Sequence, residues 1–254
     1  VTASESAPPN RRKRRILGLD DQQRQAQRRT LLLDAALELF GTRGYAKTSI
    51  ELLCQTAGIG TNSFYELFAN KEAVLVGLYD QISKALLDAL ADEYLAHQHD
   101  PDVIWALVSR FVHETVDDPR VARVAFIESA GVSAQVEEHR RQTRNDFVDG
   151  LQAIGREIRS ANHVPAGVDE RNQPGPSPRR NAVAIVGSII EMTLDWLLDP
   201  EPDPIGDLID DIARHCQRIV DAIIQETAAP PPVEAKATSP QRGQSFSPAA
   251  RKGS

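Results

Sequence analysis

The sequence has few of the residues that hold small secreted folds together. Its 254 residues include two cysteines, Cys54 and Cys216, which lie far apart in the chain. A disulfide framework needs several cysteines and structural zinc needs them in close pairs, so neither is predicted. The basic run near the start is not followed by an apolar stretch, so no signal peptide is predicted. A reducing, cytoplasmic compartment is the expected location.

Motifs that carry catalysis are missing as well. The sequence has no glycine-rich phosphate loop, no strand-turn-helix nucleophile elbow and no paired-cysteine zinc spacing. His97 and His99 flank Gln98, but we interpret them as exposed side chains at a polar helix end and not as a metal clip. The sequence therefore predicts a protein that is not an enzyme and that needs no cofactor or metal.

Long apolar runs are also scarce. The most apolar segment, residues 182–198, contains Glu191 and Asp195, and it is shorter than the roughly 20 apolar residues that cross a bilayer. No membrane association is therefore expected. No stretch alternates apolar and polar residues as a β-strand would, whereas apolar residues recur at intervals of three and four. We therefore predict an all-α fold.

Residues 48–72 carry the most specific pattern of the chain, two short helices joined by a glycine turn. Thr48 stands three residues before Glu51, which is the capping-box pattern of a helix start. Gly58 follows the last apolar residue of that helix, and a glycine there can adopt the left-handed conformation that ends a helix. The pattern predicts a helix-turn-helix.

The second helix of this pair is expected to begin at Gly60 or Thr61 and to present two different faces. Its apolar face consists of residues spaced by three and four: Phe64, Leu67 and Phe68. Its polar face carries short side chains suited to base edges or phosphates: Asn62, Ser63 and Glu66. A small helical domain inserts such a helix into the DNA major groove.

The segment from about Thr30 to Leu75 resembles the DNA-binding domain of the TetR family of bacterial regulators. Several pieces occur in the family's order and spacing: Ala35-Ala36-Leu37-Glu38-Leu39-Phe40 with Gly44-Tyr45, Thr48-Ser49-Ile50, Ala57-Gly58-Ile59, Phe64-Tyr65 with Phe68, and Asn70-Lys71-Glu72-Ala73. The remaining two thirds of the chain are similar only in helical character and size. The resemblance implies an N-terminal three-helix DNA-binding domain followed by a helical domain for ligand binding and dimerisation.

The resemblance also implies which residues contact DNA. Thr48 would contact a phosphate at the start of the second helix, and Tyr65 and Lys71 would hold phosphates on either side of the groove. Three residues would enter the groove first: Thr61, Asn62 and Ser63.

Three positions depart from the family's pattern. Gly60 stands where a serine cap is common, so the recognition helix is expected to fray or to start at Thr61. Asn62 stands where glycine is common and adds a group that can read a base. Glu66 stands where the family often has histidine, tyrosine or a cation. Its carboxylate can accept a hydrogen bond from a cytosine amino group, or be repelled by phosphate and point away, and we favour the second.

The charge distribution fits DNA binding although the net charge of the chain is -7. Residues 1–75 hold 11 basic and 8 acidic residues, whereas the remainder holds 18 basic and 28 acidic residues. The basic excess lies where DNA is expected. Its densest run, Arg11-Arg12-Lys13-Arg14-Arg15, is interpreted either as an arm that follows phosphates or a minor groove, or as a solvated tail.

The chain is predicted to divide into four parts. Residues 1–22 form a disordered basic arm, 23–70 the helix-turn-helix domain, 71–227 the ligand-binding and dimerisation domain, and 228–254 a disordered tail. Within the third part, the proline- and glycine-rich stretch 162–181 is expected to be a flexible loop.

The last two predicted helices, residues 182–198 and 204–226, carry apolar faces too wide to be hidden within one small bundle. We therefore predict a homodimer, whose two-fold axis suits a palindromic operator. Large apolar side chains are candidates for a small-molecule pocket: Trp105, Phe111, Phe126, Phe147, Met192 and Trp196. For any one of them, an ordinary core position is the simpler interpretation.

The sequence thus predicts a sequence-specific transcription regulator that acts as a repressor. A small apolar or amphipathic ligand would release it from double-stranded DNA by favouring another dimer geometry. Two other interpretations stay open. One is a DNA-binding regulator without a ligand, controlled by a protein partner or by its own abundance. The other is a small-molecule-binding helical protein without a DNA function.

Overall fold

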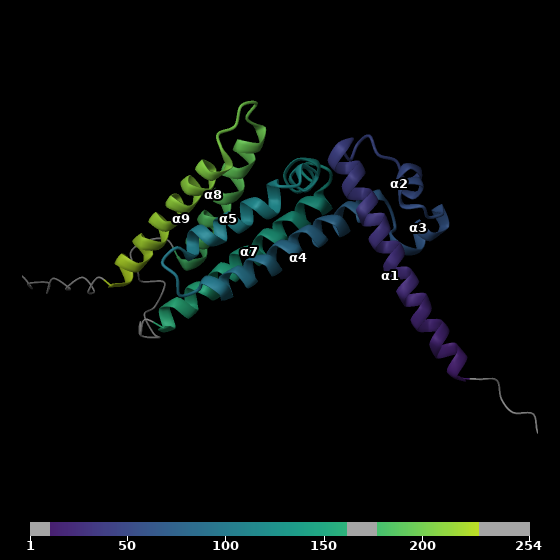
Figure 1. Cartoon of the computed structure of the whole chain (residues 1–254), viewed down its shortest axis with the longest axis horizontal. Coiled ribbons are helices and arrows are strands. Elements are labelled where there is room, and N and C mark those ends of the chain that lie inside the picture. Colours follow the sequence, from purple (N-terminus) through teal and green to yellow (C-terminus); the bar gives the residue numbers. More distant parts are fainter. Residues whose placement is uncertain (1–10, 162–176, 229–254) are drawn as a thin grey trace, which may run out of the picture.

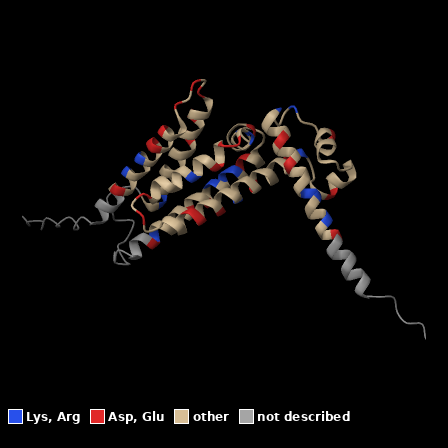
Figure 2. Cartoon of the chain, viewed as in Figure 1, with Lys and Arg blue, Asp and Glu red and all other residues tan. Residues whose placement is uncertain are grey.

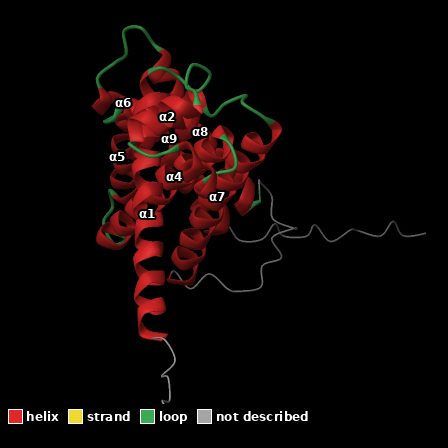
Figure 3. Ribbon diagram, turned by 90° about the vertical axis from the view of Figure 1, so that its right-hand side faces the viewer, coloured by secondary structure: helices red, strands yellow, loops and turns green. Residues whose placement is uncertain are grey.

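Helices form all the regular structure of the described residues, as predicted (Figures 1 and 3). The structure is a computed structural model that describes residues 11–161 and 177–228, with side chains described for 21–157 and 177–222. Three N-terminal helices form one unit, and a long fourth helix leads from it into a second bundle. The start of the expected arm, most of the expected loop and the expected tail lie outside the described residues.

The first helix, α1, spans Arg11–Thr42, and its N-terminal half projects away from the molecule (Figure 1). Residues 21–31 are exposed, whereas most apolar residues from Leu32 onward are buried. The helix is continuous through residues 11–22, where composition indicates a disordered arm. The basic run therefore lies on the projecting half of a helix and not on an irregular segment.

The second helix, α2, spans Ile50–Ala57, and its start differs from the expected one. Its N-cap is Ser49, whose hydroxyl accepts a hydrogen bond from the Leu52 N–H at 3.2 Å. Thr48 does not cap the helix, so the capping-box prediction of Thr48 with Glu51 is wrong by one residue. Ser49 is itself a good cap, and the spacing to Glu51 cannot distinguish two adjacent hydroxyl residues.

The turn between α2 and α3 (Thr61–Leu67) has the predicted form. Gly58 ends α2 with a φ of 67°, in the left-handed region where a side chain is unfavourable. Its N–H donates to the backbone carbonyl of Gln55 at 3.3 Å. Helix α3 begins at Thr61, and the preceding Gly60 provides no side-chain cap. This is the later of the two expected starting points.

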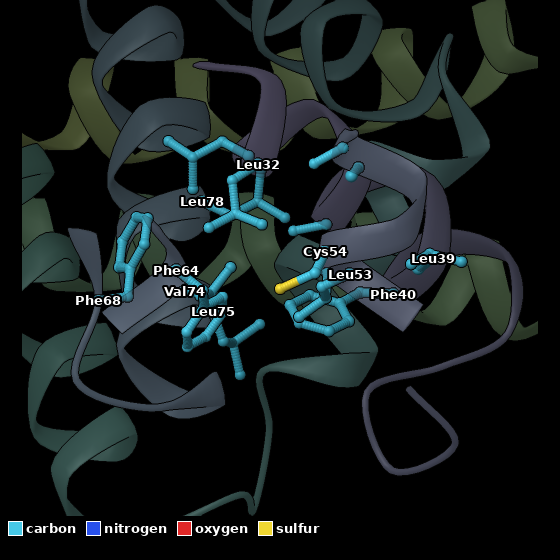
Figure 4. Close-up of a cluster of buried hydrophobic side chains, with 14 of the residues drawn as sticks. Leu32, Leu39, Phe40, Leu53, Cys54, Phe64, Phe68, Val74, Leu75 and Leu78 are labelled. Carbon is cyan, nitrogen blue, oxygen red and sulfur yellow. The ribbon is translucent and has the colours of Figure 1, made fainter. Parts of the chain in front are cut away.

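One apolar core joins the three helices to the start of α4 (Lys71–His97), as Figure 4 shows. Its largest fully buried side chains come from all four helices: Leu32, Phe40, Leu53, Phe64, Leu75 and Leu78. The apolar face predicted for the recognition helix is confirmed at Phe64 and Phe68, which are 0% and 6% exposed. The burial of Phe64 and Phe68 in this core fixes the direction in which the opposite face of α3 points.

The second bundle begins with α4, which Asn70 caps by accepting a hydrogen bond from the Ala73 N–H at 2.8 Å. The helices that follow along the chain are α5 (Val103–Val116), α6 (Pro119–Ala122), the π-helix η1 (Arg123–Glu128) and α7 (Ala134–Ala161). Helices α4 and α7 run side by side in the same direction (Figure 1). Two contacts fix this arrangement: His139 Nε2 lies 2.5 Å from an Asp80 oxygen, and the Tyr94 hydroxyl donates to Glu157 at 3.4 Å.

The last two helices are α8 (Pro178–Leu198) and α9 (Ile205–Ala228). Helix α8 starts earlier than expected because Ser177 caps it and Pro178 fits its first turn, so residues 178–181 of the expected loop are helical. By length and composition α8 could cross a membrane, contrary to the expectation from the sequence. A helix that packs against protein passes the same test, and α8 packs against α7 and α9.

Candidate DNA-binding surface and ligand cavity

The outer face of α3 is the candidate DNA-binding surface. Thr61 and Asn62 are exposed, Ser63 is half-buried, and the Tyr65 side chain is 57% exposed. The tyrosine ring contacts Phe64 edge-on, with ring centroids 5.3 Å apart, so the buried core positions the exposed hydroxyl. These four predicted residues lie together on one short helix, whose opposite face packs against the apolar core.

Glu66 also lies on the outer part of α3, but its carboxylate faces a cation of the same protein. The Glu66 carboxylate lies 3.8 Å from the Arg28 guanidinium on α1, and both side chains are largely exposed. This contact agrees with the favoured interpretation that Glu66 turns away from phosphate. The neighbouring Arg29 lies over the ring of Phe68 at 4.5 Å, which brings a second cation of α1 close to the end of α3.

Thr48 and Lys71 have internal roles that the sequence analysis did not predict. Thr48 is 2% exposed, and its hydroxyl donates to the Gly44 carbonyl at 2.9 Å. This burial does not support the predicted phosphate contact, because the hydroxyl faces the protein. The Lys71 ammonium donates to the carbonyls of Tyr45 and Thr48 at 2.8 Å each, and it lies 4.1 Å from the centre of the Tyr45 ring.

Burial lowers the pKa of Lys71, in keeping with this partly enclosed position. An ammonium group has three donors, so two internal hydrogen bonds leave one for a phosphate. Lys71 therefore ties the loop between α1 and α2 to the start of α4. A phosphate contact by the same side chain stays a prediction.

The second bundle forms a partly open cavity of about 610 Å³. Its wall is built from α4, α5, η1, α7, α8 and α9, and most of the lining side chains are apolar. The volume lies in the range of small-molecule sites. Three of the six predicted pocket residues line it, namely Phe111, Phe126 and Phe147.

The other three predicted pocket residues lie outside the cavity lining. Trp105 is 46% exposed, and its indole N–H donates to Asp210 at 2.7 Å. The Trp196 indole donates to the Asp203 carbonyl at 2.7 Å, and Met192 packs in the surrounding apolar cluster. Each tryptophan therefore ties α9 or the loop before it to a neighbouring helix.

One wall of the cavity and its polar groups were not predicted from the sequence. Helix α4 contributes Tyr79, Leu86, Leu90 and Tyr94, which recur at helical spacing along one face. Helix α7 contributes Arg140 and Arg144. Figure 2 shows basic positions gathered on α7 where it runs beside α4. The helical spacing of these residues on α4 could have indicated a cavity wall, but the same spacing is equally typical of an ordinary core face.

The π-helix η1 joins the cavity to the DNA-binding unit. Ala125 and Phe126 line the cavity on one side of η1. Glu128 accepts a hydrogen bond from the Tyr45 N–H at 2.7 Å on the other side, and its second oxygen pairs with Arg123 at 2.8 Å. Arg123 in turn donates to the Thr42 carbonyl at 3.0 Å. One turn of helix therefore contacts both the cavity and the loop between α1 and α2.

The neighbouring helix α6 approaches α1 closely at Gly41. A side-chain carbon at Gly41 would come within 2.7 Å of the Arg120 backbone, so only glycine fits there. Arg120 also donates to Glu38 of α1 at 2.8 Å. Together, α6 and η1 form the junction between the cavity and the DNA-binding unit.

Residues 32–78 match the family model described as "Bacterial regulatory proteins, tetR family". The DNA-binding unit of the chain is therefore a TetR-family domain. The chain is a helix-turn-helix transcription regulator, and the match covers the core of the DNA-binding unit described above. The resemblance seen in the sequence is thereby confirmed.

Two curated relatives illustrate the similarity of the chain to known regulators. The fatty acid metabolism regulator protein of Bacillus subtilis is 18% identical over 170 residues, which cover 67% of this chain and 84% of that protein. The HTH-type transcriptional repressor KstR2 of Rhodococcus jostii is 37% identical over 75 residues, which cover 30% of this chain and 35% of that protein.

A solved structure extends the comparison to the second bundle. The structure of the transcriptional regulator FadR from Bacillus subtilis, in complex with stearoyl-CoA, has a TM-score of 0.55 and is 16% identical. The match covers 78% of this chain and 98% of that one. At this identity the similarity establishes a shared fold across both helical units.

Proposed function

We propose that this TetR-family regulator is a homodimeric repressor that binds a palindromic operator and leaves it when an amphipathic ligand fills the cavity. The observation that carries the proposal is the position of the cavity. Its wall includes η1, and the same π-helix holds the loop of the DNA-binding unit. A regulator of this kind would act in the cytoplasm, where bacterial DNA lies.

In the proposed complex, the exposed face of α3 enters the major groove. Thr61, Asn62 and Ser63 are the candidates for base contacts, because they lie at the N-terminal end of α3 and are at least partly exposed. Tyr65 is the candidate for a phosphate contact. Thr48 and Lys71 stabilise the loop beside this surface through internal hydrogen bonds, and Lys71 keeps one N–H donor for a phosphate.

The proposed dimer forms through α8 and α9. Helix α8 is largely apolar from Ala182 onward, yet a large part of it is not buried within the chain, and Val183 and Leu198 are 45% and 61% exposed. Such apolar exposure is typical of a protein interface. A two-fold interface would place two copies of α3 at successive major grooves, about 34 Å apart.

Release from DNA follows if the ligand binds better to a dimer geometry that does not fit the operator. A ligand changes an equilibrium only by its unequal affinity for the two states. Occupancy of the cavity can change the positions of η1, which holds the loop of the DNA-binding unit through Glu128, and of α4, whose start packs in the core of that unit. The chain length of stearoyl-CoA in the FadR structure supports a long apolar ligand for the similar fold.

The test is fluorescence anisotropy on DNA upstream of the protein's own gene, with and without dodecanoyl-CoA. The expected result is specific binding of a dimer and dissociation on addition of the ligand. In a Leu90→Trp variant, the indole ring takes up part of the cavity that an alkyl chain would occupy, so DNA binding should persist while release is lost. Lys84→Trp adds the same ring to the exposed face of α4, outside the lining, and should respond like the wild type. Release of DNA from both variants alike would contradict the proposal.

A further inference from the structure

The wall that α7 contributes to the cavity changes from charged to apolar along the helix. Residues on one face recur at intervals of three and four, first charged and then apolar: Glu137, Arg140, Arg144, Phe147, Leu151 and Ile154. From Arg144 to Ile154 the helix rises by about 15 Å. The cavity therefore has one basic end and a long apolar stretch.

The two arginines at the basic end have unused hydrogen-bond donors. Arg140 Nη1 lies 3.1 Å from Glu137, but its Nε is buried and makes no hydrogen bond to the described residues. Arg144 makes no hydrogen bond or ion pair within the described part of the chain. A guanidinium has five N–H groups, so most of the donors of this pair are unused.

Glu137 does not neutralise the basic end completely. Its carboxylate already accepts a hydrogen bond from the Gly131 N–H at 2.7 Å, and this bond lowers the pKa of Glu137, with the nearby arginines adding to the effect. A third arginine of the lining, Arg141, pairs with Glu138, so Arg140 and Arg144 face one carboxylate that is partly used elsewhere. Tyr79 lies beside them on α4, and burial raises its pKa, so its hydroxyl stays a neutral donor.

We propose that Arg140 and Arg144 bind the anionic group of a long-chain amphiphile, while its alkyl chain lies against Phe147, Leu151 and Ile154. This inference rests on the proposed effector function of the cavity. Arginine is suited to carboxylate and phosphate, which it can bind through two parallel hydrogen bonds. A carboxylate and the phosphates of an acyl-CoA share this chemistry.

The far end of the cavity fixes the orientation of the ligand. Glu157 lines that end and accepts a hydrogen bond from the Tyr94 hydroxyl at 3.4 Å. A carboxylate there would repel the anionic group. The anion therefore lies at the end of the cavity nearer the DNA-binding unit, where Ser133 donates to Glu72 in the first turn of α4 at 2.9 Å.

The inference is tested by calorimetric titration of the full chain with three ligands that share a twelve-carbon chain: dodecanoate, dodecanoyl-CoA and 1-dodecanol. At least one anionic ligand should bind about 10-fold to 100-fold more tightly than the alcohol, as charge-assisted hydrogen bonds imply. Whichever anion binds more tightly identifies carboxylate or phosphate as the recognised group. Arg144→Gln should reduce this preference, and the double variant Arg140→Gln, Arg144→Gln should remove it while alcohol binding stays unchanged.

Arg156→Gln is the matched control, because Arg156 is an exposed arginine of α7 outside the cavity lining. It should keep the full preference for the anion. Equal binding of alcohol and anions by the wild type would overturn the inference. It would also be overturned if Arg156→Gln lost as much of the preference for the anion as Arg144→Gln does. If the alcohol also releases DNA, the proposed effector function stands without the anion site. If none of the three ligands binds, both are overturned.

Discussion

Glu128 is predicted to be the strongest single link between the second bundle and the DNA-binding unit. Its side chain is 15% exposed and accepts hydrogen bonds from the Tyr45 N–H and from Arg123. Glu128→Ala leaves the Tyr45 N–H without its partner, at a cost of about 1.5–2 kcal/mol. Arg123 is 39% exposed, so losing its ion pair costs only about 0.5–1 kcal/mol. The free energy of unfolding should therefore fall by about 2–3 kcal/mol.

Urea unfolding at a fixed protein concentration measures this change, because the midpoint shifts with stability when the slope is constant. Glu38→Ala is the matched control. It also removes a carboxylate that pairs across the junction, but both Glu38 and Arg120 are largely exposed, and Arg120 keeps Asp118 as a partner. Its cost should be below about 1 kcal/mol. Glu128→Gln, which keeps an acceptor oxygen, should lie between the two.

Equal midpoints for Glu128→Ala and Glu38→Ala would refute this reasoning, since burial and the contact with the Tyr45 N–H are what distinguish the two carboxylates. A second measurement distinguishes the loss of stability from a loss of coupling between the cavity and DNA binding. Glu128→Ala should still bind ligand in the cavity, yet the ligand should release less DNA, because η1 no longer holds the loop before α2.

Two further changes affect the DNA-binding unit. Gly58→Ala places a side chain at a φ of 67° with no atom near it, so strain alone should destabilise the protein by about 1–2 kcal/mol, measurable as a lower urea midpoint. A gain in stability would contradict the left-handed turn. Tyr65→Phe removes one exposed hydroxyl and should weaken binding to specific and scrambled DNA alike, measured by anisotropy. An effect confined to one base position would assign Tyr65 to base recognition instead.

The recognition helix could be predicted closely from the sequence because its signals are local. Gly58 determines the turn, and Phe64 and Phe68 determine which face of α3 is buried. The roles of Thr48 and Lys71 could not be predicted in the same way. Both roles depend on a tertiary contact between the loop after α1 and the start of α4. Such a contact produces no periodic pattern in the sequence.

The cavity shows why aromatic content alone is a poor guide to a binding site. Trp105 and Trp196 satisfy their indole N–H groups at the edge of the bundle, because a buried indole needs an acceptor and the apolar cavity offers few. The phenylalanines have no such requirement, and Phe111, Phe126 and Phe147 line the cavity. Arg140 and Arg144 look like an ordinary solvated face in the sequence. They become candidate site residues only because α4 runs parallel to α7 and encloses the space beside them.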